Sequence, residues 1–128
     1  MGKITVLFLD IEKCANSFQK LELENELESF RNTLRVDTID IVRRRIAKSE
    51  YQIVLDDEGL LKSKPICSAE DFRGFPALAG NLIITGLVDG KGNLTSLKQK
   101  DIEKISKMLV TRYSFFLGKE YKRLRLGQ

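Results

Sequence analysis

Residues 3–9 of the chain read Lys-Ile-Thr-Val-Leu-Phe-Leu, and this run decides which fold class the sequence predicts. Apolar and β-branched side chains occupy both of its alternating faces, as in a strand that is covered on both sides. We therefore expect residues 3–9 to form a strand inside a sheet, with Asp10 ending it. A second strand between Phe18 and Leu23 is expected to pair back on the first.

Two stretches outside this strand repeat apolar residues at helical spacing, which predicts two amphipathic helices. The first stretch has the apolar residues Leu23, Leu27, Phe30 and Leu34. The second has Ile102, Ile105 and Leu109. Ser96 and Gln99 precede the second stretch at the spacing of a capping box, so we expect Ser96 to be its N-cap.

The remaining segments are predicted to be strands, turns and one long loop. Residues 36–42 have the pattern of a half-exposed strand, and residues 51–61, with an acidic turn at 56–59, predict a β-hairpin. Residues 62–80 hold both prolines and are expected to be irregular, whereas 81–86 predicts a buried strand. Because strands and helices do not alternate, we predict an α+β fold, a mainly antiparallel sheet with two amphipathic helices packed on it.

The composition indicates one soluble domain and excludes several chemistries. The chain has 128 residues, which predicts a single domain over 1–128, and 42% of them are hydrophobic. It has no His, so it lacks the base of a Ser-His-Asp or Cys-His triad and any imidazole metal ligand. Its cysteines, Cys14 and Cys67, are too few for a disulfide framework, and whether they lie close together stays open. Because no secretory signal or membrane span is visible, we expect a cytoplasmic protein that does not enter a membrane.

The net charge of +4 is concentrated at one end of the chain. Five of the 22 basic residues and one of the 18 acidic residues lie in 112–128, so 17 of each remain in 1–111. We therefore interpret residues 112–128 as a basic C-terminal extension, either a final strand or a flexible arm. The five basic residues are Arg112, Lys119, Lys122, Arg123 and Arg125.

Four residues form our first candidate ligand-binding site. Arg43 and Arg45 alternate on a predicted strand and share one of its faces, and Phe72 and Arg73 lie in the long loop. Guanidinium groups match phosphate oxygens and an aromatic ring can stack on a base, so this set predicts an anionic, nucleotide-like ligand. The alternative for the arginines is a solvated strand edge protected by charge.

Two other functions are weighed against a binding site of this kind. A nucleic-acid interface would use Arg43 to Arg45 with the basic residues Lys119, Lys122, Arg123 and Arg125. A metal-dependent enzyme would use the acidic residues Asp10, Asp56 and Asp57 as oxygen ligands. Neither pattern is specific, and we assign no catalytic residue, no metal and no cofactor.

Five pieces of sequence, in order, resemble a family of unknown function that is carried by bacteriophages, plasmids and conjugative elements. They are Leu9-Asp10, the passage 21–30, residues 56–62 followed by Pro65, residues 78–86 and residues 93–97. The most telling piece is Ala79-Gly80-Asn81 with Ile84 and Gly86, and the resemblance covers about residues 3–110. It implies a mobile-element protein acting inside a bacterial cell, often beside factors that blunt host defence. It brings no catalytic residues.

From the residues and the resemblance together, we expect a non-enzymatic binding module. Its partner is expected to be a host protein or a small anionic ligand, with nucleic acid as the alternative. The oligomeric state stays open, because Phe115-Phe116-Leu117 either caps the protein's own core or forms a subunit contact.

Overall fold

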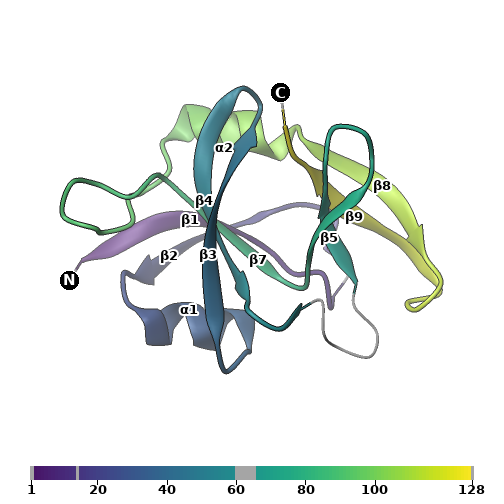
Figure 1. Ribbon diagram of the computed structural model, residues 1–128, viewed down its shortest axis with the longest axis horizontal. Coiled ribbons are helices and arrows are strands. Elements are labelled where there is room, and N and C mark those ends of the chain that lie inside the picture. The colour runs from purple at the N-terminus through teal and green to yellow at the C-terminus, as the bar shows by residue number, and fades with distance from the viewer. Residues whose placement is uncertain (1, 14, 60–65, 128) are drawn as a thin grey trace.

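The computed structural model describes residues 2–13, 15–59 and 66–127 (Figure 1). Within these residues the chain forms nine strands and two helices. In chain order they are β1 (Lys3–Leu9), β2 (Gln19–Glu24), α1 (Leu27–Leu34), β3 (Ile39–Ile46), β4 (Ser49–Asp56), β5 (Cys67–Glu70), β6 (Pro76–Ala79), β7 (Leu82–Thr85), α2 (Gln99–Ser106), β8 (Leu109–Ser114) and β9 (Lys119–Arg125).

The strands form two sheets. The larger sheet has the order β2-β1-β7-β4-β3, and all of its neighbouring strands are antiparallel. The smaller sheet has the order β6-β5-β9-β8, in which β5 and β9 run parallel and the other pairs are antiparallel. Figure 1 shows the smaller sheet beside the larger one.

The predicted α+β fold is wrong. The structure is mostly β, with 48% strand and 14% helix. It has two sheets, whereas the prediction had one sheet covered by two helices. The prediction failed because part of the predicted loop 62–80, and the basic segment after residue 112, contribute strands of a second sheet. Each helix has eight residues, and no helix within the described residues is long and apolar enough to cross a membrane.

The core lies on both faces of the larger sheet. Ile4, Val6 and Phe8 of β1 pack with Phe30 and Leu34 of α1 on one face. Leu7 and Leu9 point to the other face, into a second cluster that includes residues of the smaller sheet and Ile105 of α2. This placement confirms that residues 3–9 form a strand buried on both sides. It also explains why α1 and α2 lie on opposite sides of the larger sheet in Figure 1.

At one edge of the larger sheet, a β-hairpin joins β3 to β4 through Ala47 and Lys48. Both turn residues have positive φ, 49° and 73°, as a two-residue type I′ hairpin turn requires. The hairpin expected over 51–61 does not form in the described residues, because β3 and β7 occupy both edges of β4. Residues 60 and 61 themselves lie outside the described residues.

The C-terminal segment is built into the fold. β9 lies between β8 and β5, and its Tyr121 and Leu124 are buried in the core together with Leu126. Beyond β9, the Gly127 N–H donates a hydrogen bond to the Arg45 carbonyl, which ties the chain end to β3. Of the two alternatives for this segment, the structure shows the final strand.

Candidate functional site

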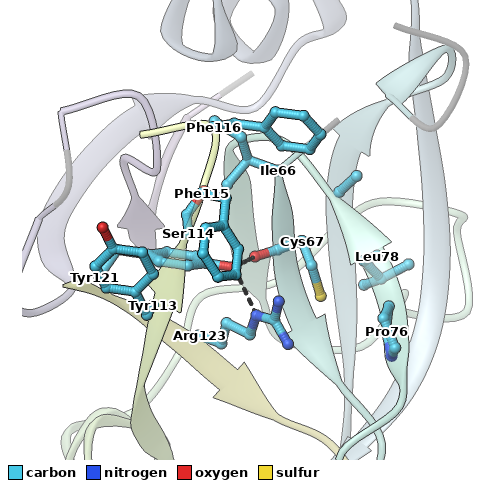
Figure 2. A pocket seen from close by; sticks show the side chains of 11 residues that line it. Ile66, Cys67, Pro76, Leu78, Tyr113, Ser114, Phe115, Phe116, Tyr121 and Arg123 are labelled. Atoms are coloured by element: carbon cyan, nitrogen blue, oxygen red, sulfur yellow. Dashed lines mark hydrogen bonds between the residues drawn. The ribbon is translucent and has the colours of Figure 1, made fainter. Parts of the chain in front are cut away.

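The smaller sheet carries a pocket of about 410 Å³ at the end where β5 begins and β8 ends (Figure 2). Its walls come from β5, β6, β8, β9 and the turn between β8 and β9, so most of the lining residues are far apart in the sequence. They are Ile66, Cys67, Pro76, Leu78, Ala79, Tyr113, Ser114, Phe115, Phe116, Tyr121 and Arg123. An apolar cavity of this size with a few polar groups is typical of a binding site.

Three aromatic residues at the tip of the β8–β9 hairpin form one side of this pocket, and we call them the aromatic tip. They are Tyr113, Phe115 and Phe116, whose exposed fractions are 55%, 93% and 60%. The rings of Tyr113 and Phe115 meet edge to face, with centroids 5.3 Å apart. Neither phenylalanine caps the core, which was one of the two predicted roles, whereas Leu117 packs against it. The aromatic tip is therefore an apolar surface that faces water.

Arg123 is the one charged side chain among the described residues that line the pocket. Its Nε donates a 2.6 Å hydrogen bond to the Tyr121 hydroxyl, which in turn donates one of 2.8 Å to the Cys67 carbonyl. The guanidinium carbon lies 5.5 Å from the Tyr121 ring centroid, within cation–π range. Two contacts with one tyrosine therefore fix this cation in the pocket wall.

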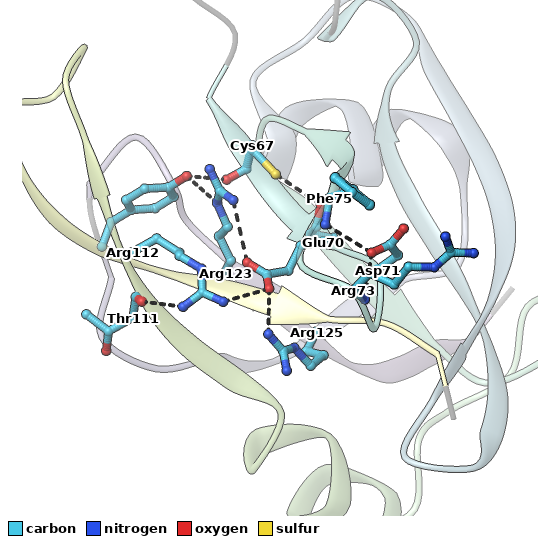
Figure 3. Close-up of polar contacts among 11 residues, drawn as sticks. Cys67, Glu70, Asp71, Arg73, Phe75, Thr111, Arg112, Arg123 and Arg125 are labelled. Atoms are coloured by element: carbon cyan, nitrogen blue, oxygen red, sulfur yellow. Dashed lines mark hydrogen bonds and ion pairs between the residues drawn. The ribbon is translucent and has the colours of Figure 1, made fainter.

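Glu70 lies beside the pocket and is completely buried among three guanidinium groups. Its Oε2 accepts hydrogen bonds from Arg112 at 2.9 Å and from Arg125 at 2.8 Å, and its Oε1 lies 3.5 Å from Arg123 Nη1. Figure 3 shows the three arginine side chains pointing toward the carboxylate. We call these four residues the Glu70 cluster.

The arginines hold Glu70 in its charged form. Burial alone would raise the pKa of Glu70, but the hydrogen bonds and charges of Arg125 and Arg112 outweigh it, and the pKa lies below its ordinary value. The pKa of Arg123 is raised overall. Burial alone would lower it, but the hydrogen bond to Tyr121 and the nearby negative groups outweigh burial. Both groups are therefore ionised at neutral pH.

Cys67 is the one thiol among the lining residues that the structure describes. Burial raises the pKa of Cys67, against the opposing charge of Arg123, and its Sγ lies 3.0 Å from the Ala69 carbonyl oxygen to which it donates. A protonated, hydrogen-bonded thiol is a poor nucleophile at neutral pH. The sequence left open whether Cys14 lies close to Cys67, and Cys14 is outside the described residues.

The structure places the first candidate ligand-binding residues in two groups outside the pocket. Arg43 Nε lies 2.7 Å from Glu50 Oε1, and Arg45 Nη2 lies 3.9 Å from Glu50 Oε2, on the β3–β4 hairpin. Phe72 and Arg73 lie in the turn between β5 and β6, with the Arg73 guanidinium 5.4 Å from the Phe72 ring centroid. Figure 3 shows Arg73 pointing away from the Glu70 cluster. The structure does not gather these four side chains into one pocket.

The four basic residues proposed for nucleic acid all lie on β9. Arg123 and Arg125 belong to the Glu70 cluster, and Lys122 Nζ donates a 2.6 Å hydrogen bond to Thr111 Oγ1. Lys119 is exposed. Two of the four charges therefore have an internal carboxylate partner, which reduces the positive surface available to phosphates.

Of the three acidic residues considered as metal ligands, two accept hydrogen bonds within the protein and one is exposed. The Asp10 carboxylate accepts hydrogen bonds from Arg35, at 2.9 Å, and from the Lys13 N–H. Asp56 Oδ1 accepts one from the Glu58 N–H, and Asp57 is exposed. Among residues 2–13, 15–59 and 66–127, no three His, Cys, Asp or Glu side chains gather in a way that could hold a metal ion.

Sequence reasoning missed Glu70, Tyr121 and the contribution of Cys67 to the pocket. Glu70 is separated from Arg123 by 53 positions, and its neighbours belong to a segment that was predicted to be irregular. The signal that was present is the clustering of Arg112, Arg123 and Arg125 in one short segment. A group of cations on neighbouring strands needs a carboxylate, but the sequence does not say which one.

The family model for a domain of unknown function, DUF3846, matches residues 4–110. The match spans most of the chain, including β1 to β7, α2 and the first residues of β8. It ends before the aromatic tip and β9. Comparisons with curated proteins and with solved structures found no match.

Proposed function

The chain belongs to the DUF3846 family of domains of unknown function, and we propose that it is a binding module that docks a partner protein on the pocket and the aromatic tip. The partner's apolar side chains would enter the pocket, and its surface would cover the aromatic tip. Protein interfaces are enriched in buried aromatic and arginine residues, and the pocket and its tip contain both types.

The exposure of Phe115 is the observation that carries this proposal. It is 93% exposed, the largest fraction among the exposed large apolar residues that the structure describes. A contiguous apolar surface of this kind, next to a pocket, is characteristic of a site that another molecule covers. Covering one phenylalanine side chain is worth roughly 1.5–3 kcal/mol.

The geometry favours a protein over a small anion bound at the predicted arginines. Arg43 and Arg45 have Glu50 as their partner, and Phe72 and Arg73 lie on a different hairpin. A small nucleotide-like ligand would need phosphate and base contacts within one cavity. The described residues of the pocket instead offer a broad aromatic surface and a single cation.

The proposal includes no chemical step. The chain has no His, and the raised pKa of Cys67 keeps the pocket's thiol protonated at neutral pH. The resemblance to proteins of phages, plasmids and conjugative elements supports a bacterial host protein as the partner, with interference in host defence as the outcome. That context is part of the proposal and rests on the resemblance alone.

Site-specific photo-crosslinking in bacterial cells tests the proposal. A photoreactive phenylalanine analogue replaces Phe116 at the aromatic tip or, as the control, Leu27, an exposed apolar residue of α1. We expect a discrete crosslinked protein from position 116 that is absent from position 27 and disappears when Phe115→Ser is added. Equal crosslinking from both positions, or none from position 116, would contradict the proposal.

A further inference from the structure

The Glu70 cluster has more positive than negative charge. Three guanidinium groups surround one carboxylate, and no other carboxylate pairs with them among the described residues. The carboxylate is also shared unequally, because Oε2 is within 2.9 Å of both Arg112 and Arg125, while Arg123 is 3.5 Å from Oε1. Arg123 is therefore the cation with the weakest internal ion pair.

Arg123 is also the member of the cluster that lines the pocket. Its side chain is 18% exposed, Nε is used by Tyr121, and Nη1 has the long contact with Glu70. Nη2 makes no hydrogen bond to any residue that the structure describes. A fixed cation with an available N–H group, inside an apolar cavity, is suited to bind one anionic oxygen.

We infer that the pocket binds an acidic segment of the partner, in which a large apolar side chain lies next to a carboxylate that pairs with Arg123. This inference rests on the proposed function and names the chemistry of its partner. The apolar side chain would pack between the aromatic tip and the aliphatic wall made by Ile66, Pro76 and Leu78. The carboxylate would take the free side of the Arg123 guanidinium.

A carboxylate fits this site better than a phosphate group. A phosphate dianion presents three oxygens, each of which needs donors when water is excluded. The pocket supplies one incompletely used guanidinium, and its other described lining residues carry no charge. A carboxylate, with two oxygens, leaves fewer acceptors without a donor than a phosphate group does, and the surplus positive charge of the Glu70 cluster favours an acidic segment.

Selection from a library of random segments tests the inference. The segments are displayed inside a carrier protein, so that their only carboxylates are those of Asp and Glu side chains. We expect segments selected on the wild-type protein to combine a large apolar residue with an adjacent Asp or Glu. Changing that residue to Asn or Gln is expected to lower affinity at least tenfold. Selected segments without acidic enrichment, or with unchanged affinity after the change, would overturn the inference.

Variants of the protein complete the test. Arg123→Met should lower affinity by a similar factor and remove the difference between the acidic and the amide segment, whereas Arg43→Met, the control on β3, should change neither. Equal affinity of the wild type and Arg123→Met would overturn the inference. Should Arg123→Met fail to fold, the acidic and amide segments compared on the wild type still decide.

Failure of the proposed function gives a different result from failure of this inference. Segments that bind independently of the aromatic tip, with equal affinity for the wild type and Phe115→Ser, would count against the proposed function. Segments that need the tip but neither an acidic residue nor Arg123 would leave the docking surface in place and overturn only its proposed chemistry.

Discussion

At the scale of single residues, Glu70 has the most demanding environment in the structure. A fully buried carboxylate is stable only when its charge is compensated, and here the compensation comes from Arg112, Arg123 and Arg125. The arginine side chains remain partly exposed, at 37%, 18% and 35%. The cluster therefore contributes both to the stability of the smaller sheet and to the charge beside the pocket.

We predict that Glu70→Gln lowers the free energy of unfolding by about 2 kcal/mol at neutral pH. The pKa of Glu70 lies below its ordinary value of 4.5, so its contribution is fully present above pH 4.5 and is lost as the pH falls through the lower folded-state pKa. Chemical denaturation across a pH series measures the difference between wild type and variant. That difference should be constant down to about pH 4.5 and shrink below it.

The matched control is Glu50→Gln. Glu50 pairs with Arg43 on an exposed hairpin, and exposed pairs contribute roughly 0–1 kcal/mol. A Glu70→Gln variant as stable as the wild type at neutral pH, or a difference that persists unchanged in acid, would contradict this account of the cluster.

The partners of single residues also show why the candidate functional site was only partly predictable from the sequence. Arg123 was predicted only as one of four basic residues for nucleic acid, and its partners Glu70 and Tyr121 are set by strand pairing that no local pattern reveals. Arg43 and Arg45 were predicted to lie on a strand, and β3 contains both. Their carboxylate partner Glu50 lies across a hairpin whose turn was not predicted. Cross-strand partners depend on register, which single-sequence reasoning does not fix.

Among the elements, the β3–β4 turn destabilises the folded state, because two residues other than glycine adopt positive φ there. Ala47 and Lys48 both adopt left-handed backbone conformations, at φ of 49° and 73°, which residues with a Cβ disfavour. Asn-Gly is the pair that type I′ turns prefer. Because this pair was absent, the turn gave no recognisable signal and the hairpin was predicted over 51–61.

We predict that the double substitution Ala47→Asn and Lys48→Gly raises the free energy of unfolding by about 1–2 kcal/mol. The gain comes from relieving the left-handed strain at both positions, and the shift in denaturation midpoint measures it. Lys91→Gly is the control, since Lys91 lies in another turn and does not have positive φ. An unchanged midpoint for the double variant would contradict the strain argument.

Both helices form where local periodicity predicted them, but the predicted stripes were too long, because Leu23 lies on β2 and Leu109 on β8. Elements fixed by distant contacts were not predicted. β1 was predicted because its sequence pattern requires cover on both faces. The N-cap of the second helix is Lys98 rather than the predicted Ser96, because the Ser96 hydroxyl accepts a hydrogen bond from the Thr5 N–H and the Asp101 carboxylate accepts one from the Lys98 N–H. A tertiary contact thus displaced a good local capping signal.

At the scale of the whole molecule, the C-terminal strand decides the architecture. β9 joins β5 in parallel pairing and β8 in antiparallel pairing, so the smaller sheet depends on it. Parallel pairing with a strand 55 positions earlier leaves no mark in the sequence of either strand. The α+β prediction failed at this point.

We predict that deleting residues 119–128 abolishes cooperative unfolding. The deletion removes Tyr121, Leu124 and Leu126 from the core, which is far beyond what a domain of marginal stability tolerates. Circular dichroism during thermal unfolding measures the result. The control is Lys119→Ala with Lys122→Ala, which removes two charges and is expected to unfold cooperatively; a truncated protein that does the same would contradict the structural role of β9.

The proposed function requires a partner that covers the pocket and the aromatic tip. Backbone amide NMR shifts of the isotope-labelled protein, recorded with and without the partner found by crosslinking, locate the covered surface residue by residue. We expect the largest changes in residues 66–67, 77–79 and 113–123. Changes centred instead on the β3–β4 hairpin or on residues 71–73, with the pocket unaffected, would contradict it.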